Sequence, residues 1–248
     1  MLVKNEYDRQ GLLAIGSIVA EVLADLSEQA RPGVTTRNLD DRARVLLAAA
    51  GAESTPAKEY NFPGQLCISV NNEVVHGIPG DRVLAEGDLL KLDLTADKQG
   101  FVADATRMVL LDPADELATR LADCATRACR AAIAIARPGL ELSKLGAAIN
   151  KIVKESGFHV VKELCGHGVG RHVHEEPEVP NFADRANRGI LKKGMVITIE
   201  PIIKAGRGGV RTLADGWTIV TSDKSLSAHY EETIIIGDDG GEIITVRA

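Results

Sequence analysis

Aromatic residues, cysteine pairs and long apolar runs are all scarce in this 248-residue chain. Phenylalanine, tryptophan and tyrosine together make up only 3% of it, so a local cluster of them is informative. The four cysteines include no C-x-x-C pair, which argues against a zinc ribbon or a redox motif and fits a reducing compartment. No apolar run approaches the ~18 residues of a membrane helix, and the charged N-terminus lacks the apolar stretch of a signal peptide. We therefore expect a cytoplasmic protein without a membrane segment.

An excess of positive charge is missing as well. The net charge is −6, which argues against nucleic-acid binding over the whole surface. Hydrophobic residues make up 45% of the chain and charged residues 26%, as in ordinary globular proteins. The length allows one large domain or two small ones, with an ample core.

Four acidic residues lie inside or directly beside apolar strand patterns, where a lone carboxylate would be costly to bury. They are Asp93, Asp104, Glu200 and Glu231. Too few bases lie nearby to pair them all, although Lys91 and Arg107 could form ordinary ion pairs with the first two. The pattern favours a cluster of acids around a bound cation.

The chain also repeats itself. Ala30–Gly33 recurs as Ala136–Gly139, and at nearly the same separation Glu86–Asp93 aligns with Lys193–Glu200. Two of the unusual acids therefore occupy equivalent positions, and a pseudo-twofold fold would aim both at one central point. We expect a single catalytic domain, residues 1–248, made of halves of about 1–112 and 113–248.

The same order of elements is expected in each half. In the first half, helical spacing of apolar residues predicts a helix near 8–28, and Thr35 or Thr36 can cap a second one that ends before Gly51. Strand patterns follow at 66–70, 89–95 and 101–111. The fold class is therefore α+β, with two helix pairs covering a curved antiparallel sheet.

The second half repeats this order from Pro113 onward. One helix is expected to run to about Ala136, and a second is expected to be capped by Ser143 and ended by Gly157. Strands are expected at 196–202, 217–220, 229–236 and 243–246.

The segment Gly166–Pro177 is crowded with glycines and histidines. Four carboxylates and one imidazole can hold two divalent ions a few Å apart through bridging carboxylates. A set made mostly of oxygen suits Mn²⁺, Fe²⁺ or Co²⁺ better than a thiolate-type zinc site, so Zn²⁺ is less favoured. Asp93 and Asp104 lie across a predicted hairpin and could face one site from paired strands.

Several motifs together resemble the signature of the type I methionine aminopeptidases. The resemblance runs from about Arg9 to Val246, and its motifs are jointly specific although each is weak alone. The matching segments are Cys67–Pro79, Leu92–Thr95, Ala103–Thr106, Gly166–Gly170, His174–Pro177, Thr198–Pro201, Asp215–Thr218 and Ser225–Thr233. The family has the pseudo-symmetric pita-bread fold of metallopeptidases, in agreement with the repeat.

The resemblance implies a metal-dependent aminopeptidase that removes the initiator methionine from nascent proteins and prefers a small second residue. It implies that the metal ligands are Asp93, Asp104, His167, Glu200 and Glu231. It also implies that His76 and His174 contact the substrate. Asn71 and Ser227 match positions that in some members help to hold a monovalent cation, Na⁺ or K⁺.

The expected mechanism is attack on the methionine carbonyl by a hydroxide that bridges the two metals. Glu200 is the candidate proton shuttle, His174 would stabilise the developing oxyanion, and His76 would contact the scissile nitrogen or the following backbone. The resemblance also implies a pocket for the methionine side chain. The residues around it would be Tyr60, Phe62, Cys67, His76 and Trp217. Val173 replaces an aromatic residue of some members, which changes the expected pocket shape.

A basic segment near the C-terminal third suggests a partner. Lys204, Arg207 and Arg211 occur there without an acid between them. A solvated loop is the plainer interpretation. Contact with ribosomal RNA through phosphate neutralisation is the functional one. We otherwise expect a monomer that acts on the N-terminal methionine of nascent peptides.

Three other interpretations compete. A proline-directed peptidase of the same fold usually carries an additional N-terminal domain, for which there is no room before Tyr7. The type II methionine enzymes carry a long insertion, whereas Glu200 and Glu231 lie close together in this sequence. A non-catalytic binding protein on this fold would have lost the metal ligands, which are all present.

Overall fold

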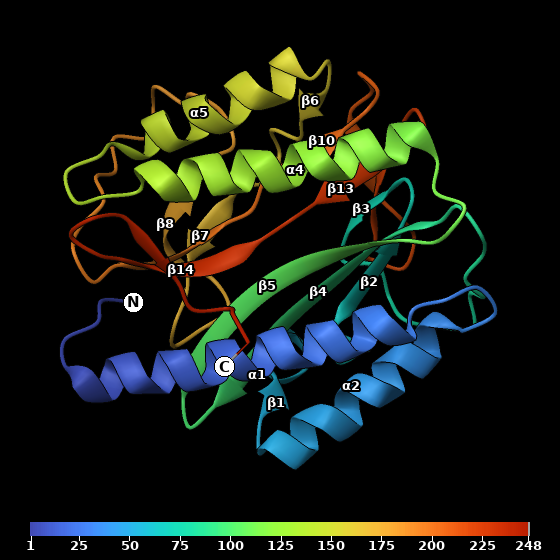
Figure 1. The fold of residues 1–248 in the computed structure, drawn as a ribbon, viewed down its shortest axis with the longest axis horizontal. Coiled ribbons are helices and arrows are strands. Elements are labelled where there is room, and N and C mark those ends of the chain that lie inside the picture. The colour runs from blue at the N-terminus through green and yellow to red at the C-terminus, as the bar shows by residue number, and fades with distance from the viewer. Residues whose placement is uncertain (248) are drawn as a thin grey trace.

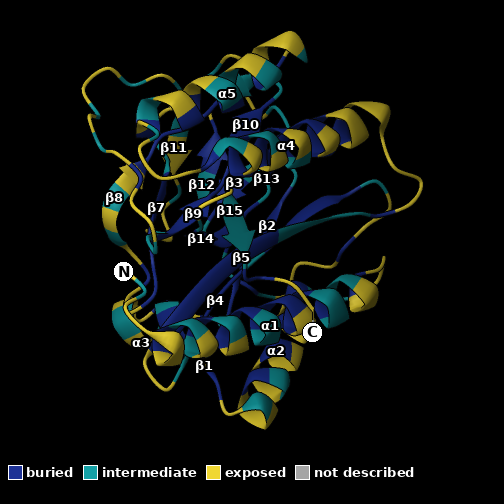
Figure 2. Cartoon of the chain, turned by 60° about the vertical axis from the view of Figure 1, so that its left-hand side comes forward, coloured by how far each residue is buried: buried dark blue, intermediate teal, exposed yellow. Residues whose placement is uncertain are grey.

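The computed structural model describes residues 1–247, and Ala248, the last residue of the predicted domain, lies outside them. Two pairs of helices flank a central layer of strands (Figure 1). The helices α1 and α2 lie on one side of the strands, and α4 and α5 lie on the other. The outward faces of these helices are exposed, while the strands between them are largely buried (Figure 2).

The first helix pair follows the predicted pattern closely. Helix α1 (Glu6–Gln29) buries an apolar stripe that includes Leu12, Val19 and Leu26. Helix α2 (Thr36–Ala50) begins with a capping box between Thr35 and Asn38 and ends at Gly51, which takes a left-handed φ of 63°. Helix α1 packs on the strands that carry the first two acids, and α2 packs against α1 and adds Leu39, Ala43 and Leu47 to the same core.

Helix α1 bears on the expectation that no membrane segment is present. Within residues 1–247 it is the one helix long and apolar enough to cross a membrane by length and composition alone, because Glu21 and Asp25 interrupt it only lightly. Its apolar residues are buried in the core against β4 and β5, and the core helix of a globular protein passes the same test.

The strands of the first half are built around one long hairpin. Strands β4 (Leu89–Lys98) and β5 (Phe101–Leu110) pair along their full length, with Asp93 opposite Thr106 and Thr95 opposite Asp104. Side chains alternate between the faces of a strand, so Asp93 and Asp104 share one face, as predicted. The shorter elements are β1 (Glu53–Ser54), α3 (Thr55–Tyr60), β2 (Cys67–Val70) and β3 (Glu73–Val75).

The second helix pair consists of α4 (Glu116–Ile135) and α5 (Leu142–Glu155). The prediction that Ser143 caps α5 is wrong. The N-cap lies two residues earlier, at Glu141, which makes no capping bond with its side chain. The start is fixed by tertiary contacts instead, because the Leu142 N–H donates to the carbonyl of Gly189 at 2.9 Å.

The strands of the second half are shorter than predicted. They are β6 (His159–Val160), β7 (Gly166–Gly168), β8 (Glu175–Val179), β9 (Val196–Ile199), β10 (Ile202–Lys204), β11 (Val210–Thr212), β12 (Ile219–Thr221), β13 (Ser227–His229), β14 (Glu232–Ile236) and β15 (Gly241–Ile243). The predicted strand 196–202 divides at Glu200–Pro201, where proline has no N–H to donate. The predicted strand 229–236 also divides, at Tyr230 and Glu231, where no proline is present. Both acids therefore stand at breaks in the strand ladder.

Within the described residues, 1–247, the antiparallel strands form four sheets, and several contacts join the two halves. Strand β3 of the first half pairs with β12 of the second. Thr106 on β5 forms an isolated bridge with Glu231. The core beneath α1 also includes Val169, Val196 and Ile235 from the second half. The two halves are thus closely packed where the acids meet.

Candidate metal centre

The predicted metal ligands meet in one cavity of about 150 Å³ that is lined by both halves. The cavity wall includes Asp93, Asp104, His167, Glu200 and Glu231. It also includes each residue expected to contact substrate, namely Tyr60, Phe62, Cys67, His76, His174 and Trp217. The structure therefore brings the expected ligand set and the expected substrate pocket to the same place.

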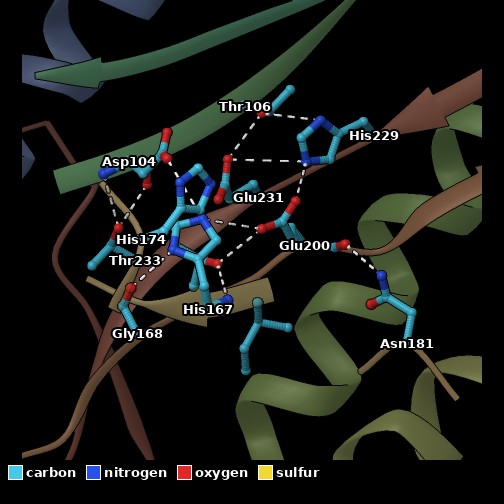
Figure 3. Close-up of polar contacts among 12 residues, drawn as sticks. Asp104, Thr106, His167, Gly168, His174, Asn181, Glu200, His229, Glu231 and Thr233 are labelled. Atoms are coloured by element: carbon cyan, nitrogen blue, oxygen red, sulfur yellow. Dashed lines mark hydrogen bonds and ion pairs between the residues drawn. The ribbon is translucent and has the colours of Figure 1, made fainter. Parts of the chain in front are cut away.

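Three of the predicted ligands are close enough to share a metal ion. Asp104 on β5, His167 on β7 and Glu231 before β14 each offer one ligand atom, and these atoms lie within 4.8 Å of one another (Figure 3). All three residues are buried. One carboxylate oxygen of Asp104 has no hydrogen-bond partner, although it is fully enclosed. A buried, unpaired carboxylate oxygen aimed into an acidic cavity fits a divalent cation.

Glu200 joins this group through the histidines. Its Oε1 lies 3.4 Å from Nε2 of His167, and its Oε2 lies 3.2 Å from Nε2 of His229 (Figure 3). Asp93 completes the set from β4 and keeps part of its surface open to the cavity. Carboxylates that converge in this way, together with one imidazole, are a suitable donor set for divalent metal ions.

A second layer of hydrogen bonds orients the ligands. The Thr198 hydroxyl accepts a bond from the backbone N–H of His167 at 3.0 Å and donates to Oε1 of Glu200 at 3.1 Å. The Thr106 hydroxyl donates to Oε2 of Glu231 at 3.0 Å. Such outer partners fix the direction in which a ligand presents its lone pair.

The tautomer of His167 follows from its other ring nitrogen. Its Nδ1 lies 2.9 Å from the carbonyl oxygen of Gly168, which can only accept a hydrogen bond. Nδ1 therefore carries a proton, and Nε2 is left to face the acids. The glycines on both sides of His167 are required, because a Cβ on Gly168 would lie 2.2 Å from the carbonyl oxygen of Glu176.

Burial and mutual repulsion both act against ionisation of the acids. Burial, followed by the charges of neighbouring carboxylates, raises the pKa values of Asp93 and Glu231 well above their ordinary range. Burial also raises the pKa of Asp104. Burial would raise the pKa of Glu200 too, but its bond to His229 and the nearby His167 outweigh that effect and lower it. The cluster thus carries a strong negative potential that a divalent cation would neutralise.

His174 and His76 occupy the open side of the cavity. The ring of His174 packs edge-on against His167 with centroids 4.4 Å apart, and its Nδ1 lies 3.0 Å from the hydroxyl of Tyr60. Burial and the neighbouring His167 lower the pKa of His174 to about 4. Burial also lowers the pKa of His76. Both rings are therefore neutral near pH 7.

The backbone at His76 takes an uncommon conformation. Its φ is 58°, in the left-handed region that few non-glycine residues adopt. Gly77 follows, and a Cβ there would lie 2.3 Å from the carbonyl oxygen of Ile68. The close approach of this turn to β2 holds His76 at the cavity wall.

The apolar end of the cavity matches the pocket predicted for methionine. Phe62 and Trp217 meet edge to face with ring centroids 5.2 Å apart, and the buried Val173 also lines the cavity. Burial and the nearby acids raise the pKa of the Cys67 thiol well above its ordinary value. Cys67 therefore stays protonated and serves as a small apolar wall.

Sequence reasoning missed His229 as a site residue. Its ring is 2% exposed and lies 3.2 Å from Glu200 and 4.0 Å from Glu231. A histidine two positions before one of the four acids, at the end of a buried strand, was the available signal. The apolar wall residues Val75, Leu164 and Ile202 were also missed, because nothing distinguishes them from ordinary core residues.

Lys91 has other partners than the one its place in the sequence suggests. Lys91 does not pair with Asp93, because its amine donates to the carbonyl oxygens of Asn71 and Ser227. These are the residues expected to help hold a monovalent cation. Burial lowers the pKa of this amine to about 7.

The basic segment is only partly available to a partner. Arg207 and Arg211 are exposed, as a phosphate contact would need. Lys204 is buried, and its amine donates to the carbonyl oxygen of Gly208 within the same turn. The expectation that Lys204 presents a free surface charge is therefore wrong.

Comparison with known proteins identifies the family. The family model described as metallopeptidase family M24 matches residues 10–238. The methionine aminopeptidase of Escherichia coli K12 is 39% identical over 99% of this chain and 94% of its own length. That of Staphylococcus epidermidis is 41% identical over 99% of this chain and 98% of its own length. The crystal structure of methionine aminopeptidase from Rickettsia prowazekii superimposes with a TM-score of 0.95 at 35% identity, over 99% of this chain and 100% of that one. The chain belongs to metallopeptidase family M24, and within it to the methionine aminopeptidases.

Proposed function

We propose that this chain is a metal-dependent aminopeptidase that removes the initiator methionine from nascent proteins and prefers a small second residue. The observation that carries the proposal is the meeting of Asp104, His167 and Glu231 in one buried cavity beside an apolar pocket. Its support from relatives is the full-length similarity to methionine aminopeptidases.

The proposed cofactor is a pair of divalent metal ions. Asp93, Asp104, His167, Glu200 and Glu231 would hold them, and the preference would be for Fe²⁺, Mn²⁺ or Co²⁺ over Zn²⁺. When bound, such ions polarise a carbonyl group and lower the pKa of water. The raised pKa values of Asp93, Asp104 and Glu231 support this, because burial and then the neighbouring carboxylates oppose their ionisation, which bound cations would favour.

Glu200 is the proposed proton shuttle. Its lowered pKa keeps the carboxylate ionised, so it can accept a proton from an attacking water and pass it to the departing amine. The Thr198 hydroxyl donates to its Oε1, and Nε2 of His229 lies 3.2 Å from its Oε2. This arrangement leaves the carboxylate little freedom to turn away from the cavity.

The histidines on the open side are proposed to bind the reacting amide. With Tyr60 donating to Nδ1, His174 carries its proton on Nε2 and can donate to the oxygen that gains charge. His76 would contact the scissile nitrogen or the following backbone. The negative cavity would attract the free α-amino group of the substrate, which accounts for an exopeptidase. Phe62, Cys67 and Trp217 would enclose the flexible thioether.

The deciding experiment is the release of N-terminal residues from short peptides by chelated protein resupplied with Mn²⁺, Fe²⁺ or Co²⁺. Metal-dependent cleavage of Met-Ala-Ser, but not of Leu-Ala-Ser or of peptides with proline in second position, is the expected result. Cleavage before proline would assign the protein to the proline-directed peptidases of the same fold. No cleavage by folded, metal-loaded protein would support a binding protein instead.

The ligand assignment has a separate test. Asp104→Ala and Glu231→Ala are each expected to give folded protein without activity. Full activity of either variant in saturating metal would contradict the two-metal assignment. Circular dichroism on the same samples separates loss of the site from loss of the fold.

Contact with the ribosome is a second proposal, now supported by Arg207 and Arg211 rather than by all three bases of the segment. Cosedimentation with ribosomes at low salt is expected to weaken in the double variant Arg207→Ala, Arg211→Ala. Lys204→Ala is the matched control, because that amine is used within the turn. Unchanged cosedimentation of the double variant would remove the proposal.

The two halves are proposed to form one catalytic domain that acts as a cytoplasmic monomer. The pairing of β3 with β12 and the bridge between Thr106 and Glu231 support one cooperative unit. A single thermal transition and a monomeric mass by light scattering are the expected results.

A further inference from the structure

Lys91 is among the largest fully buried side chains of the protein, and the proposed reaction does not use it. It is 1% exposed and lies on β4, opposite Ser69 and Met108. A buried lysine needs a compensating set of partners. The partners of this one are oxygens of the main chain and of a hydroxyl.

The amine of Lys91 lies in a small cage of oxygens. Nζ donates to the carbonyl oxygen of Asn71 at 2.8 Å, to that of Ser227 at 3.2 Å, and more weakly to the Ser227 hydroxyl at 3.5 Å. An ammonium group has three N–H donors, which equals the number of these acceptors. The lysine thus satisfies its donors with dipoles from two separate segments.

The cage is held in shape by its own hydrogen bonds. The backbone N–H of Ser227 donates to the carbonyl of Asn71 at 3.1 Å, and the Ser227 hydroxyl lies 2.9 Å from the carbonyl oxygen of Glu73. The side chain of Asn71 bonds in turn to Asp88 and to the backbone of Leu89. The carbonyls therefore converge because the fold positions them, and not because the lysine draws them together.

Converging main-chain carbonyls are also the ligands that a free monovalent cation accepts in place of water. A free ion bound there would stabilise the fold only in proportion to its concentration. At a pH below its pKa of about 7, the ammonium group of Lys91 is present on β4 at all salt concentrations. It also occupies the position that the ion would need.

The cage lies between elements that carry the metal centre. Asn71 belongs to the turn before β3, and the turn after β3 carries His76. Ser227 begins β13, which ends at His229. Lys91 is two residues from Asp93, on the same face of β4. A bond from Lys91 to both segments thus joins the first half to the second beside the acids.

We propose that the amino group of Lys91 is a built-in cation, which fills the oxygen cage of Asn71 and Ser227 and makes a free Na⁺ or K⁺ unnecessary there. The inference concerns the cage alone and holds whether or not the proposed peptidase activity is found.

The test compares melting temperatures in potassium, sodium, ammonium and tetramethylammonium chloride at one ionic strength, with chelated protein. The wild type is expected to melt at the same temperature in all four salts. Lys91→Ala leaves the cage open, so its lower melting temperature should rise in potassium, sodium or ammonium but not in bulky tetramethylammonium. Lys91→Met fills the same space without a donor, and it should stay destabilised in every salt.

Three results would overturn the proposal. One is a wild-type melting temperature that rises specifically with potassium or sodium. Another is a Lys91→Ala variant that responds equally to all four salts. The third is a Lys91→Met variant as stable as the wild type.

A crystallographic measurement on the wild type remains decisive if the alanine variant does not fold. Crystals grown with rubidium chloride are expected to show no anomalous peak between the carbonyl oxygens of Asn71 and Ser227. A rubidium peak at that position in the wild type would show that a free ion binds beside Lys91 and would refute the proposal.

Discussion

The hydroxyl of Tyr60 lies 3.0 Å from Nδ1 of His174, a contact that joins helix α3 of the first half to the start of β8 in the second. Burial raises the pKa of Tyr60, and the pKa of His174 is lowered to about 4, so near pH 7 the phenol is protonated and the imidazole is neutral. A phenol that donates to Nδ1 places the ring proton on Nε2. In that arrangement Tyr60 selects the tautomer that can donate into the cavity.

Tyr60→Phe is expected to lower kcat by about 2- to 12-fold, the equivalent of a net hydrogen bond of ~0.5–1.5 kcal/mol. The aromatic wall of the pocket is kept, so KM should change little. Steady-state kinetics on Met-Ala-Ser measures both constants. Tyr7→Phe is the control, because Tyr7 is exposed and away from the cavity. An unchanged kcat in Tyr60→Phe would refute a role for this bond.

The low pKa of His174 has a measurable consequence in the metal-free protein. The unfolded ring has a pKa of 6.5, whereas the folded ring has one of about 4. Between these values the unfolded state binds the proton more readily, so this group destabilises the fold as the pH falls through that window. The NMR titration of the His174 ring, assigned with His174→Gln, should have a midpoint near 4. A midpoint at or above 6.5 would contradict the structure.

Local patterns were sufficient to predict much of the fold. The apolar spacing of α1 and the Thr35 cap and Gly51 end of α2 are decided within a few residues. The hairpin that carries Asp93 and Asp104 follows from two apolar runs separated by a short turn. The acids themselves were recognisable because a carboxylate inside an apolar pattern is costly in free energy to bury unless it is paired, protonated or bound to a metal.

What the sequence did not reveal depends on contacts between distant segments. Helix α5 begins after Glu141 because residues near Gly189 pair with it, and no local signal marks that pairing. The strand breaks at Glu200 and Glu231 arise because the chain passes from one sheet to another. The partner of Lys91 could not be read from its neighbours, since Asp93 is nearer in sequence than Asn71 or Ser227.

Thr198 offers a test of the layer that supports the metal ligands. Thr198→Val removes the hydroxyl that accepts from His167 and donates to Glu200. The expected result is about 10- to 100-fold weaker metal binding, as for other outer partners of metal ligands. Isothermal titration with Mn²⁺ measures it. Thr126→Val is the control, because that hydroxyl bonds only to Ala122 on α4. Equal Mn²⁺ affinity of the wild type and Thr198→Val would contradict the assignment.

The repulsion among the acids predicts that the metal-free protein becomes less stable as the pH rises. In the folded protein the pKa of Asp104 lies above its ordinary value of 3.8. Burial is the main cause, and the charge of Glu200 makes a smaller contribution. Above pH 3.8 the Asp104 carboxyl ionises more readily in the unfolded protein than in the folded one. Its ionisation therefore destabilises the folded state as the pH rises through the folded pKa. Asp104→Asn removes this charge and should raise the melting temperature of chelated protein near pH 7 by about 2–8 °C, for ~1–2 kcal/mol.

The same variant should lose activity and the stabilisation by Mn²⁺, whereas Asp239→Asn, on the exposed surface, should change neither. A chelated Asp104→Asn protein that melts below the wild type at pH 7 would mean that Asp104 stabilises the fold without metal.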